Sequence, residues 1–348
     1  MTGAREAFGD LIHILDDGST APRDWRAVID LAGETLTIGR LADAVLRVDA
    51  GFHVPANARE LLLDIRTRAE KRNDLLISQF HELLTPLNEI GVRPIVMKGL
   101  ARLLSTPRER SRLLSDIDLL VPQDRRNDCI GVFTRLGYEI VIGADDDSIP
   151  PVFARSKDAG TVDLHTRLKP PDVELGYEAV EPHCEEIWFR EGVALLPGPT
   201  AQLILTVLHD QMNDRDYWRG LVDVRHLLDI ACLVREGVDW PLASSFFATP
   251  TLQRAFKVQM VTAHHLLKID IPEEYLEDRW VRLQMVRRRF QWRYPSSRAL
   301  FTLLTIAADP PQGSTSLTHS ALSDPRRALD KIKERFERYV WRLHPGKH

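Results

Sequence analysis

Two aspartates separated by one residue stand at the start of an apolar run. Asp116 and Asp118 flank Ile117, and the chain continues as Leu119-Leu120-Val121. In a β-strand, residues two apart point to the same face, with Cα atoms about 6.6 Å apart. Two carboxylates on one face of a strand are typical ligands of a hard divalent cation. The pair therefore predicts a cation site, although strand-end aspartates can also cap neighbouring backbone N–H groups.

The same spacing recurs at two other places, and the surrounding residues distinguish the three. Asp145 and Asp147 lie in a Gly-Ala-Asp-Asp-Asp-Ser run, which has the composition of a turn. Asp214 and Asp216 lie in an Asn-Asp-Arg-Asp run that is typical of a loop after a helix. Only the first pair begins an apolar strand, so that pair is the candidate.

Two further features favour a cation site there. Upstream, Lys98-Gly99 follows a predicted strand and opens a predicted helix, where free N–H groups and a lysine can hold a phosphate. Downstream, Asp163 stands between apolar neighbours in Val162-Asp-Leu-His165. Three converging carboxylates repel by roughly 4 kcal/mol per pair at 4 Å and an effective dielectric near 20. Magnesium bound together with a nucleotide phosphate would neutralise them.

The elements that position these residues change character along the chain. Apolar residues recur at three and four positions between residues 3 and 90, which predicts helices. Short β-branched or alternating runs follow, and residues 125–136 form a predicted helix between two of them. The predicted strands are 93–97, 116–121, 137–142, 152–155, 161–165, 187–190 and 193–196.

The chain is predicted to be helical again after the sheet. The Pro-Gly-Pro punctuation at 197–199 ends the strands, and residues 200–308 have a helical pattern. We therefore predict an α+β fold, with a small mixed sheet in a core of residues 91–199 and helical regions at 1–90 and 200–308. Residues 309–348 are predicted to be a loop and a last helix that begins at Pro325.

Several of these motifs, taken in their order along the chain, resemble those of a known family. The Lys98-Gly99 pair, the stretch from Arg110 to Val121, Gly137-Tyr138 and the Asp-Leu-His of 163–165 are similar to bacterial nucleotidyltransferase-like proteins of the polymerase-β superfamily. The resemblance covers roughly residues 60–270. Its helical part rests on four further segments, Leu203 to His209, Trp218, Leu221 to Ile230 and Val238-Asp-Trp240.

The resemblance implies a role for each matching position. Asp116, Asp118 and Asp163 match the family's catalytic metal carboxylates, and Lys98-Gly99 matches its phosphate-holding turn. Most members of the superfamily have Gly-Ser or Gly-Gly at this turn, so the serine near the triphosphate is missing here. The implied cofactor is Mg²⁺, or Mn²⁺ in its place, with an NTP as co-substrate.

Other residues are weaker candidates. Arg110, Arg112 and Ser115 precede Asp116 and are candidates for nucleotide binding, since arginine is a bidentate donor, while a solvated loop is the alternative. Three more residues are candidates for the acceptor site or the cleft, and we expect the helices of 200–308 to wall that cleft. They are His165, His209 and Asp223. A packed histidine and hydrogen bonds that tie helices together are the corresponding structural readings.

Composition limits the partners. Lys and Arg number 46 against 50 Asp and Glu, a net charge of -4, so no global field attracts nucleic acid or an anionic membrane. Accordingly, we interpret the arginines and aromatic residues of 280–298 as a solvated amphipathic helix rather than an RNA-binding segment. The three cysteines have no paired spacing, which predicts no disulfides and a cytoplasmic setting. No run approaches the length of a membrane span.

Three functions follow from these patterns. The first is a Mg²⁺-dependent nucleotidyltransferase that moves a nucleoside monophosphate from an NTP to an acceptor and releases pyrophosphate. The acceptor, whether protein, peptide, RNA or small molecule, leaves no pattern in the sequence. The second is a metal-dependent glycosyltransferase, since Asp-x-Asp also binds nucleotide sugars, but such folds usually start with a nucleotide-binding half rather than helices. The third is a non-catalytic or antitoxin-like binding protein, which is disfavoured because no carboxylate of the set is lost.

Overall fold

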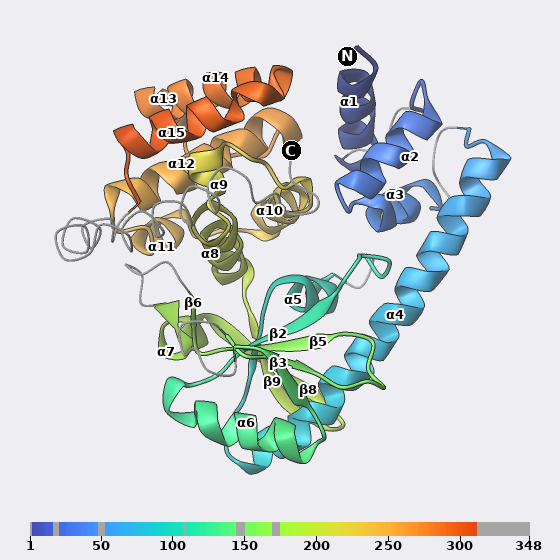
Figure 1. The fold of residues 1–348 in the computed structure, drawn as a ribbon, viewed down its shortest axis with the longest axis vertical. Helices are drawn as coiled ribbons and strands as arrows, with labels where there is room; N and C mark the ends of the chain where they lie inside the picture. The colour runs from blue at the N-terminus through green and yellow to red at the C-terminus, as the bar shows by residue number, and fades with distance from the viewer. Residues whose placement is uncertain are drawn as a thin grey trace, which may run out of the picture. The chain divides into compact units, whose positions relative to one another are not determined.

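The computed structural model describes residues 2–16, 21–47, 53–106, 109–143, 150–168 and 175–311. The chain divides into two compact units. One comprises residues 1–168 and 175–205, and the other comprises residues 169–174 and 206–348. Figure 1 traces their elements from blue to red along the chain. The Asp145 and Asp147 pair lies outside the described residues, as does all of the predicted C-terminal region beyond residue 311.

The first unit begins with four helices. They are α1 (Thr2–Asp16), α2 (Trp25–Glu34), α3 (Ile38–Val45) and α4 (Ala56–Glu89). The Asp24 side chain starts α2 by accepting hydrogen bonds from two backbone N–H groups of its first turn. Buried apolar side chains from all four helices form one cluster, including Leu11, Val28, Leu41 and Leu62. Only the first part of α4 belongs to this cluster, and the rest of the helix continues to the sheet.

The sheet of the first unit is mixed and has seven strands in the order β3-β4-β5-β2-β1-β9-β8. Its strands are β1 (Ile95–Val96), β2 (Asp116–Leu120), β3 (Glu139–Ile142), β4 (Val152–Ala154), β5 (Thr161–His165), β8 (Cys184–Phe189) and β9 (Gly192–Pro197). The central strands β2 and β5 are parallel to each other. β1 runs antiparallel to β2 and parallel to β9. Two parallel strands therefore lie side by side in the middle of the sheet.

Short helical and strand elements connect these strands. They are α5 (Lys98–Ser105), the 3₁₀ turn η1 (Gln123–Arg125), α6 (Arg126–Arg135), α7 (Tyr177–Val180) and the 3₁₀ turn η2 (Glu181–His183). A separate two-stranded hairpin is formed by β6 (Arg167–Leu168) and β7 (Leu175–Gly176). The hairpin and α7 were not predicted, because runs of two to four residues are too short to show a periodicity.

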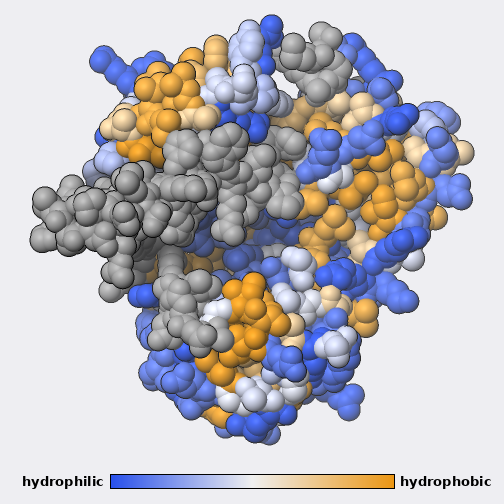
Figure 2. All heavy atoms as spheres, viewed as in Figure 1, coloured by the Kyte–Doolittle hydropathy of each residue, from blue (hydrophilic) through white to orange (hydrophobic). Residues whose placement is uncertain are grey.

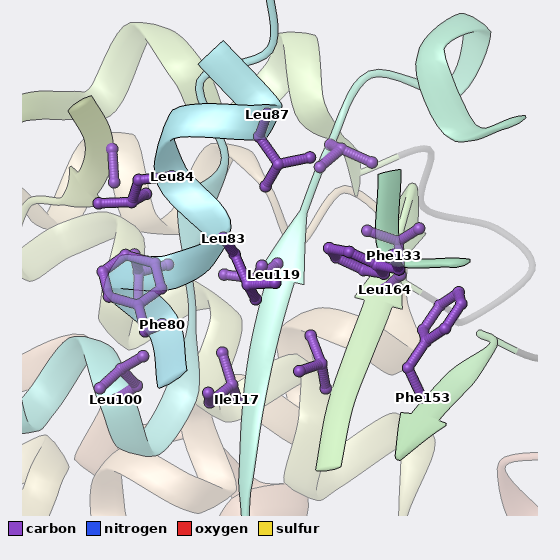
Figure 3. Packing of buried hydrophobic residues seen from close by; sticks show 14 of the residues in the cluster. Phe80, Leu83, Leu84, Leu87, Leu100, Ile117, Leu119, Phe133, Phe153 and Leu164 are labelled. Atoms are coloured by element: carbon purple, nitrogen blue, oxygen red, sulfur yellow. The ribbon is translucent and has the colours of Figure 1, made fainter. Parts of the chain in front are cut away.

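Helices α4 and α6 cover one face of the sheet with apolar side chains. Figure 3 shows Leu83 of α4 beside Leu119 of β2, and Phe80, Leu84 and Leu87 of the same helix belong to the same cluster. The α4 positions recur at three and four residues and so lie on one face of the helix. Phe133 of α6 and Leu164 of β5 belong to the same cluster. Since strand side chains alternate, the neighbours of Leu119 and Leu164 point to the opposite face of the sheet.

The predicted fold class is confirmed. The chain has an α+β architecture in which a mixed sheet is preceded and followed by helices. The predicted strands correspond to β1 to β5, β8 and β9, with ends that differ by a few residues. Within the described ranges, no helix combines the length and the apolar character that crossing a membrane would need.

The second unit is helical. Its chain enters through α8 (Pro199–Leu208), which begins in the first unit, and continues through the π-helical turn η3 (His209–Asn213). The later elements are α9 (Asp216–Arg219), α10 (Val224–Glu236), α11 (Trp240–Ser245), α12 (Pro250–Leu267), α13 (Glu273–Glu277), α14 (Arg279–Arg293), the 3₁₀ turn η4 (Pro295–Ser297) and α15 (Arg298–Ala308). Side chains of Asp223, Asp239, Thr249 and Asp278 cap four of these helices.

Exposed apolar side chains gather on α14 and α15 of this unit. Leu283, Val286 and Phe290 of α14 are 44% to 63% exposed, and Leu300 and Leu304 of α15 are more than half exposed. Hydrophobic spheres are visible at the upper left of Figure 2, where Figure 1 places these helices. The prediction that residues 280–298 form a solvated amphipathic helix is therefore wrong in one respect. The exposed face of α14 is partly apolar.

Candidate active site

The acidic residues of the candidate site lie on the two central parallel strands. The register pairs Asp118 of β2 with Asp163 of β5, and it pairs Leu120 with His165. Asp116 lies two residues before Asp118 and is paired with Thr161. Because paired residues of adjacent strands point to the same side, all three aspartates share the sheet face that α4 and α6 leave uncovered.

The structure brings three side chains closest together. The carboxylates of Asp118 and Asp163 and a ring nitrogen of His165 all lie within 4.8 Å of one another. Asp116 is on the same face but is not a member of this close group, and its carboxylate accepts a hydrogen bond from the Ser115 side chain. The sequence allowed either an active or a packed role for His165, and the structure places it in the close group with Asp118 and Asp163.

The Asp118 carboxylate is the most strongly held group of the site. The residue is 2% exposed, and its Oδ1 lies 2.6 Å from Lys98 Nζ and 2.9 Å from His165 Nε2. Burial on its own raises the pKa of Asp118, but the Lys98 ammonium and His165 hold that pKa well below its usual range. Burial lowers the pKa of His165, which favours the neutral ring. Asp118 therefore stays ionised.

The other two carboxylates lack such strong compensation. Burial, reinforced by the charges of Asp118 and Asp116, raises the pKa of Asp163 to about 7. Burial and the charge of Asp118 also raise the pKa of Asp116. An excess of buried negative charge on one face is the electrostatic condition that a divalent cation relieves. The carboxylate oxygens of Asp118 and Asp163 fit Mg²⁺, which protein sites usually hold through one or two carboxylates.

The Lys98-Gly99 turn lies beside these carboxylates. It follows β1 and opens α5, and the Met97 backbone N–H donates to the Asp118 carbonyl at 3.0 Å, which ties the turn to β2. At Gly99, a Cβ would lie 2.5 Å from Leu114 Cδ2 and 3.8 Å from Arg112 Nε. The absence of a side chain thus allows the segment before β2 to approach the start of the helix closely.

The two candidate arginines both lie in the segment before β2, but their surroundings differ. Arg112 is 8% exposed and lies against Gly99, with its Nη1 3.9 Å from Glu109 Oε2. Arg110 is exposed and pairs with Asp74 of α4 at 2.8 Å, and Ser115 is exposed next to Asp116. The structure therefore places Arg112, rather than Arg110, at the Lys98-Gly99 turn.

A set of contacts that the sequence did not reveal fixes this segment. Arg40 of α3 pairs with Glu109 at 2.6 Å. Asn73 of α4 donates to the carbonyls of residues 110 and 112, and Arg72 donates to the carbonyl of Leu114. These partners lie 37 to 69 positions apart in the chain, so no local pattern could indicate them. The N-terminal helices thus hold the segment that leads into Asp116.

The two candidates in the helical unit have different surroundings. Asp223 is 1% exposed, caps α10 and pairs with Arg225 at 2.7 Å. His209 lies in η3, with its ring 6.1 Å from that of His226. A second close group, Asp210, Asp223 and His226, was not predicted. Whether the helical unit walls the site stays a prediction, because it concerns the arrangement of the two units.

The arginines of α14 also have internal roles. Arg287 and Arg288 are 5% and 6% exposed. Arg287 donates to the Tyr217 carbonyl at 3.0 Å, and Arg288 donates to Thr262 at 2.7 Å. Burial lowers the pKa of Arg287 to about 9, with a further contribution from the charge of Arg288. In the predicted solvated amphipathic helix, these two arginines therefore lie on the buried side and belong to the core of the second unit.

Comparisons with known proteins agree with the resemblance seen in the sequence. A family model described as uncharacterised nucleotidyltransferase matches residues 21–268. No curated protein matches the chain. Among solved structures, the solution structure of the antibiotic-resistance factor ANT(2'')-Ia is 16% identical, with a TM-score of 0.37. The match covers 57% of this chain and 97% of that one.

Proposed function

Since this chain belongs to the family of uncharacterised nucleotidyltransferases, we propose that it transfers a nucleoside monophosphate from an NTP to an acceptor in a Mg²⁺-dependent reaction. An oxygen of the acceptor attacks the α-phosphorus of the NTP. The bond between the α-phosphorus and the bridging oxygen breaks, and pyrophosphate leaves. The acceptor oxygen loses its proton, if it carries one, to solvent or to a nearby base.

One observation carries this proposal. Asp118 and Asp163 are register partners on adjacent parallel strands, and the Lys98-Gly99 turn lies beside them. Phosphoryl transfer depends mainly on positioning and on neutralising charge, and this arrangement offers both a cation site and a phosphate site. Mg²⁺ bound by Asp118 and Asp163 would act as a Lewis acid on the phosphate oxygens.

The chain's own residues have separate tasks in this proposal. Lys98 and the backbone N–H groups at the start of α5 bind the phosphates, and Arg112 supports them from the segment beside Gly99. Ser115 orients Asp116 through its hydrogen bond. His165, which is buried like Asp118, holds the Asp118 carboxylate through its ring Nε2. His209 and Asp223 remain candidates for the acceptor side, and the cytoplasm remains the proposed setting.

The test is transfer of the nucleotide label. Each of the four NTPs, labelled at the α-phosphorus, is incubated with the protein and Mg²⁺ in cell extract, and the labelled product is then isolated. We expect one NTP to label an acceptor, with no labelling by Asp118→Asn. The matched control is Asp74→Asn, which changes an exposed aspartate of α4 that is not a member of the close acidic group.

A different distribution of label would overturn the proposal. If no NTP gives a labelled product while a sugar-labelled nucleotide sugar does, the protein is a glycosyltransferase. If Asp118→Asn labels the acceptor as fast as the unchanged protein does, the transfer does not take place at this site.

A further inference from the structure

Lys98 has a backbone conformation that lysine rarely adopts. Its φ is +50°, in the left-handed region that favours glycine, although it is the first residue of α5. Residues held in such conformations persist where the surrounding structure determines them, and they cluster at functional sites. The Lys98 side chain reaches β2, where its ammonium contacts Asp118.

The ammonium contacts the same carboxylate that is expected to bind a metal ion. Lys98 Nζ lies 2.6 Å from Asp118 Oδ1, and the two side chains are 22% and 3% exposed. The cation that compensates Asp118 is therefore supplied by the chain itself.

Asp163 differs from Asp118 in this respect. Among the described residues, no cationic side chain forms an ion pair with the Asp163 carboxylate. A divalent cation that binds both carboxylates would share the Asp118 carboxylate with the Lys98 ammonium. Two cations on one carboxylate repel each other strongly in a buried site.

We propose that the Lys98 ammonium and a divalent cation compete for Asp118, so that Lys98 releases this carboxylate when the ion binds and turns to the phosphates of the nucleotide. This inference rests on the proposed function and adds a second task for Lys98. The flexible four-carbon stem of lysine and its three rotatable donors suit such a transfer. Before the ion arrives, the ammonium holds the Asp118 side chain in place.

Competition predicts opposite effects of Lys98 on two ligands. Loss of the ammonium should tighten the binding of a divalent cation alone, because its competitor is gone. The same change should weaken the binding of the nucleotide, because a phosphate partner is lost. A lysine that only binds phosphate would leave the affinity for the ion unchanged, and a lysine that only stabilises the fold would not tighten it.

The first experiment is a calorimetric titration with Mn²⁺ alone. Lys98→Met and Lys98→Gln are expected to bind Mn²⁺ at least about tenfold more tightly than the unchanged protein, which corresponds to about 1.4 kcal/mol. The matched control is Lys157→Met, which removes an exposed lysine near Glu82 and should leave the affinity unchanged. With Mn²⁺ present, both Lys98 variants are expected to bind ATP more weakly.

The second experiment uses only the unchanged protein, so it does not depend on the folding of a variant. Lysines are acetylated with acetic anhydride, and each site is quantified by mass spectrometry. Saturating Mn²⁺ is expected to speed the acetylation of Lys98 several-fold and to leave that of Lys157 unchanged. An unchanged or slower rate at Lys98 would overturn the competition.

The outcomes separate this inference from the proposed function. If Mn²⁺ binds and Asp118→Asn abolishes the binding, but neither Lys98 variant binds the ion more tightly, only the competition is wrong. If Mn²⁺ binds no site that depends on Asp118, then the proposed metal-dependent transfer is wrong, and the competition is wrong with it.

Discussion

Arg40 and Glu109 form an ion pair in which two guanidinium nitrogens of the arginine donate to one carboxylate oxygen, at 3.0 Å and 2.6 Å. Arg40 lies on α3 in the N-terminal cluster, and Glu109 lies in the segment that leads to Asp116. The same carboxylate oxygen is 3.9 Å from Arg112. Through Glu109, the N-terminal helices are therefore connected to the arginine that lies against Gly99.

Arg40→Met should destabilise the protein and loosen the nucleotide site. Removal of hydrogen bonds between charged, largely buried partners costs about 1.5–3 kcal/mol, which urea unfolding would measure. Arg68→Met removes an exposed pair with Asp64 and should cost less than about 0.5 kcal/mol. If Glu109 positions Arg112, the affinity for Mg²⁺-ATP should fall in Arg40→Met and recover in part in Arg40→Lys. A loss of stability with full nucleotide affinity would limit the pair to a structural role.

Arg112→Met and Arg110→Met should differ in their effect on nucleotide binding. Arg112 is buried beside the Lys98-Gly99 turn, which is proposed to bind the phosphates, so its loss should weaken Mg²⁺-ATP binding roughly tenfold. Arg110 is exposed and paired with Asp74, so its loss should change the affinity less than about twofold. Equilibrium titration with ATP would measure both. The assignment of Arg112 would have to be withdrawn if the two variants behaved alike.

Asp163 should give the stability a characteristic pH dependence when divalent cations are chelated. Its pKa is raised from 3.8 to about 7 in the fold, so the folded state binds this proton more tightly than the unfolded chain does. The contribution of Asp163 therefore favours the fold at low pH and declines as the pH rises from about 4 to about 7. The Tm of the unchanged protein should therefore fall relative to that of Asp163→Asn across that range, because the neutral amide does not titrate.

Addition of Mg²⁺ should reverse this trend, because the ion binds the deprotonated carboxylate. The rise in Tm caused by Mg²⁺ should therefore grow as the pH passes through about 7. Thermal unfolding with and without the ion, at several pH values, measures both effects. A rise in Tm that is constant over this range would show that Asp163 is not a ligand.

Asp223→Ala should act mainly on stability. The side chain caps α10 and pairs with Arg225, and loss of a cap alone costs about 0.5–2 kcal/mol. Asp223→Asn keeps a capping side chain and should recover part of this loss. His209→Ala, in contrast, should lower the rate of transfer to the acceptor if the helical unit walls the cleft. Full transfer activity in His209→Ala would place the acceptor pocket elsewhere.

Local patterns were sufficient to predict the strands that carry the aspartates. Alternation in residues 116–120 and 161–165 places acidic and apolar side chains on opposite faces, and the structure has strands at both places. The close approach of His165 to Asp118 depends on the register between β2 and β5, which no single strand encodes. For the same reason, the sequence did not show that Asp116 lies outside the closest group.

Other features depend on tertiary contacts. The Arg40 pair joins residues 69 positions apart, and the Lys98 conformation is imposed by its surroundings rather than favoured by lysine itself. The sequence also did not show that Arg287 and Arg288 are buried. Polar partners from other parts of the second unit compensate the cost of burying these two guanidinium groups. Composition describes an average surface and does not identify such exceptions.

Helix α4 has a consequence for any attempt to divide this protein into smaller pieces. Its 34 residues span about 51 Å, and they supply side chains to the N-terminal cluster at one end and to the sheet at the other. A cut between these two parts would fall inside a continuous helix and would expose the apolar side chains of both fragments. The N-terminal helices and the sheet should therefore be expressed and crystallised together, as one folding unit.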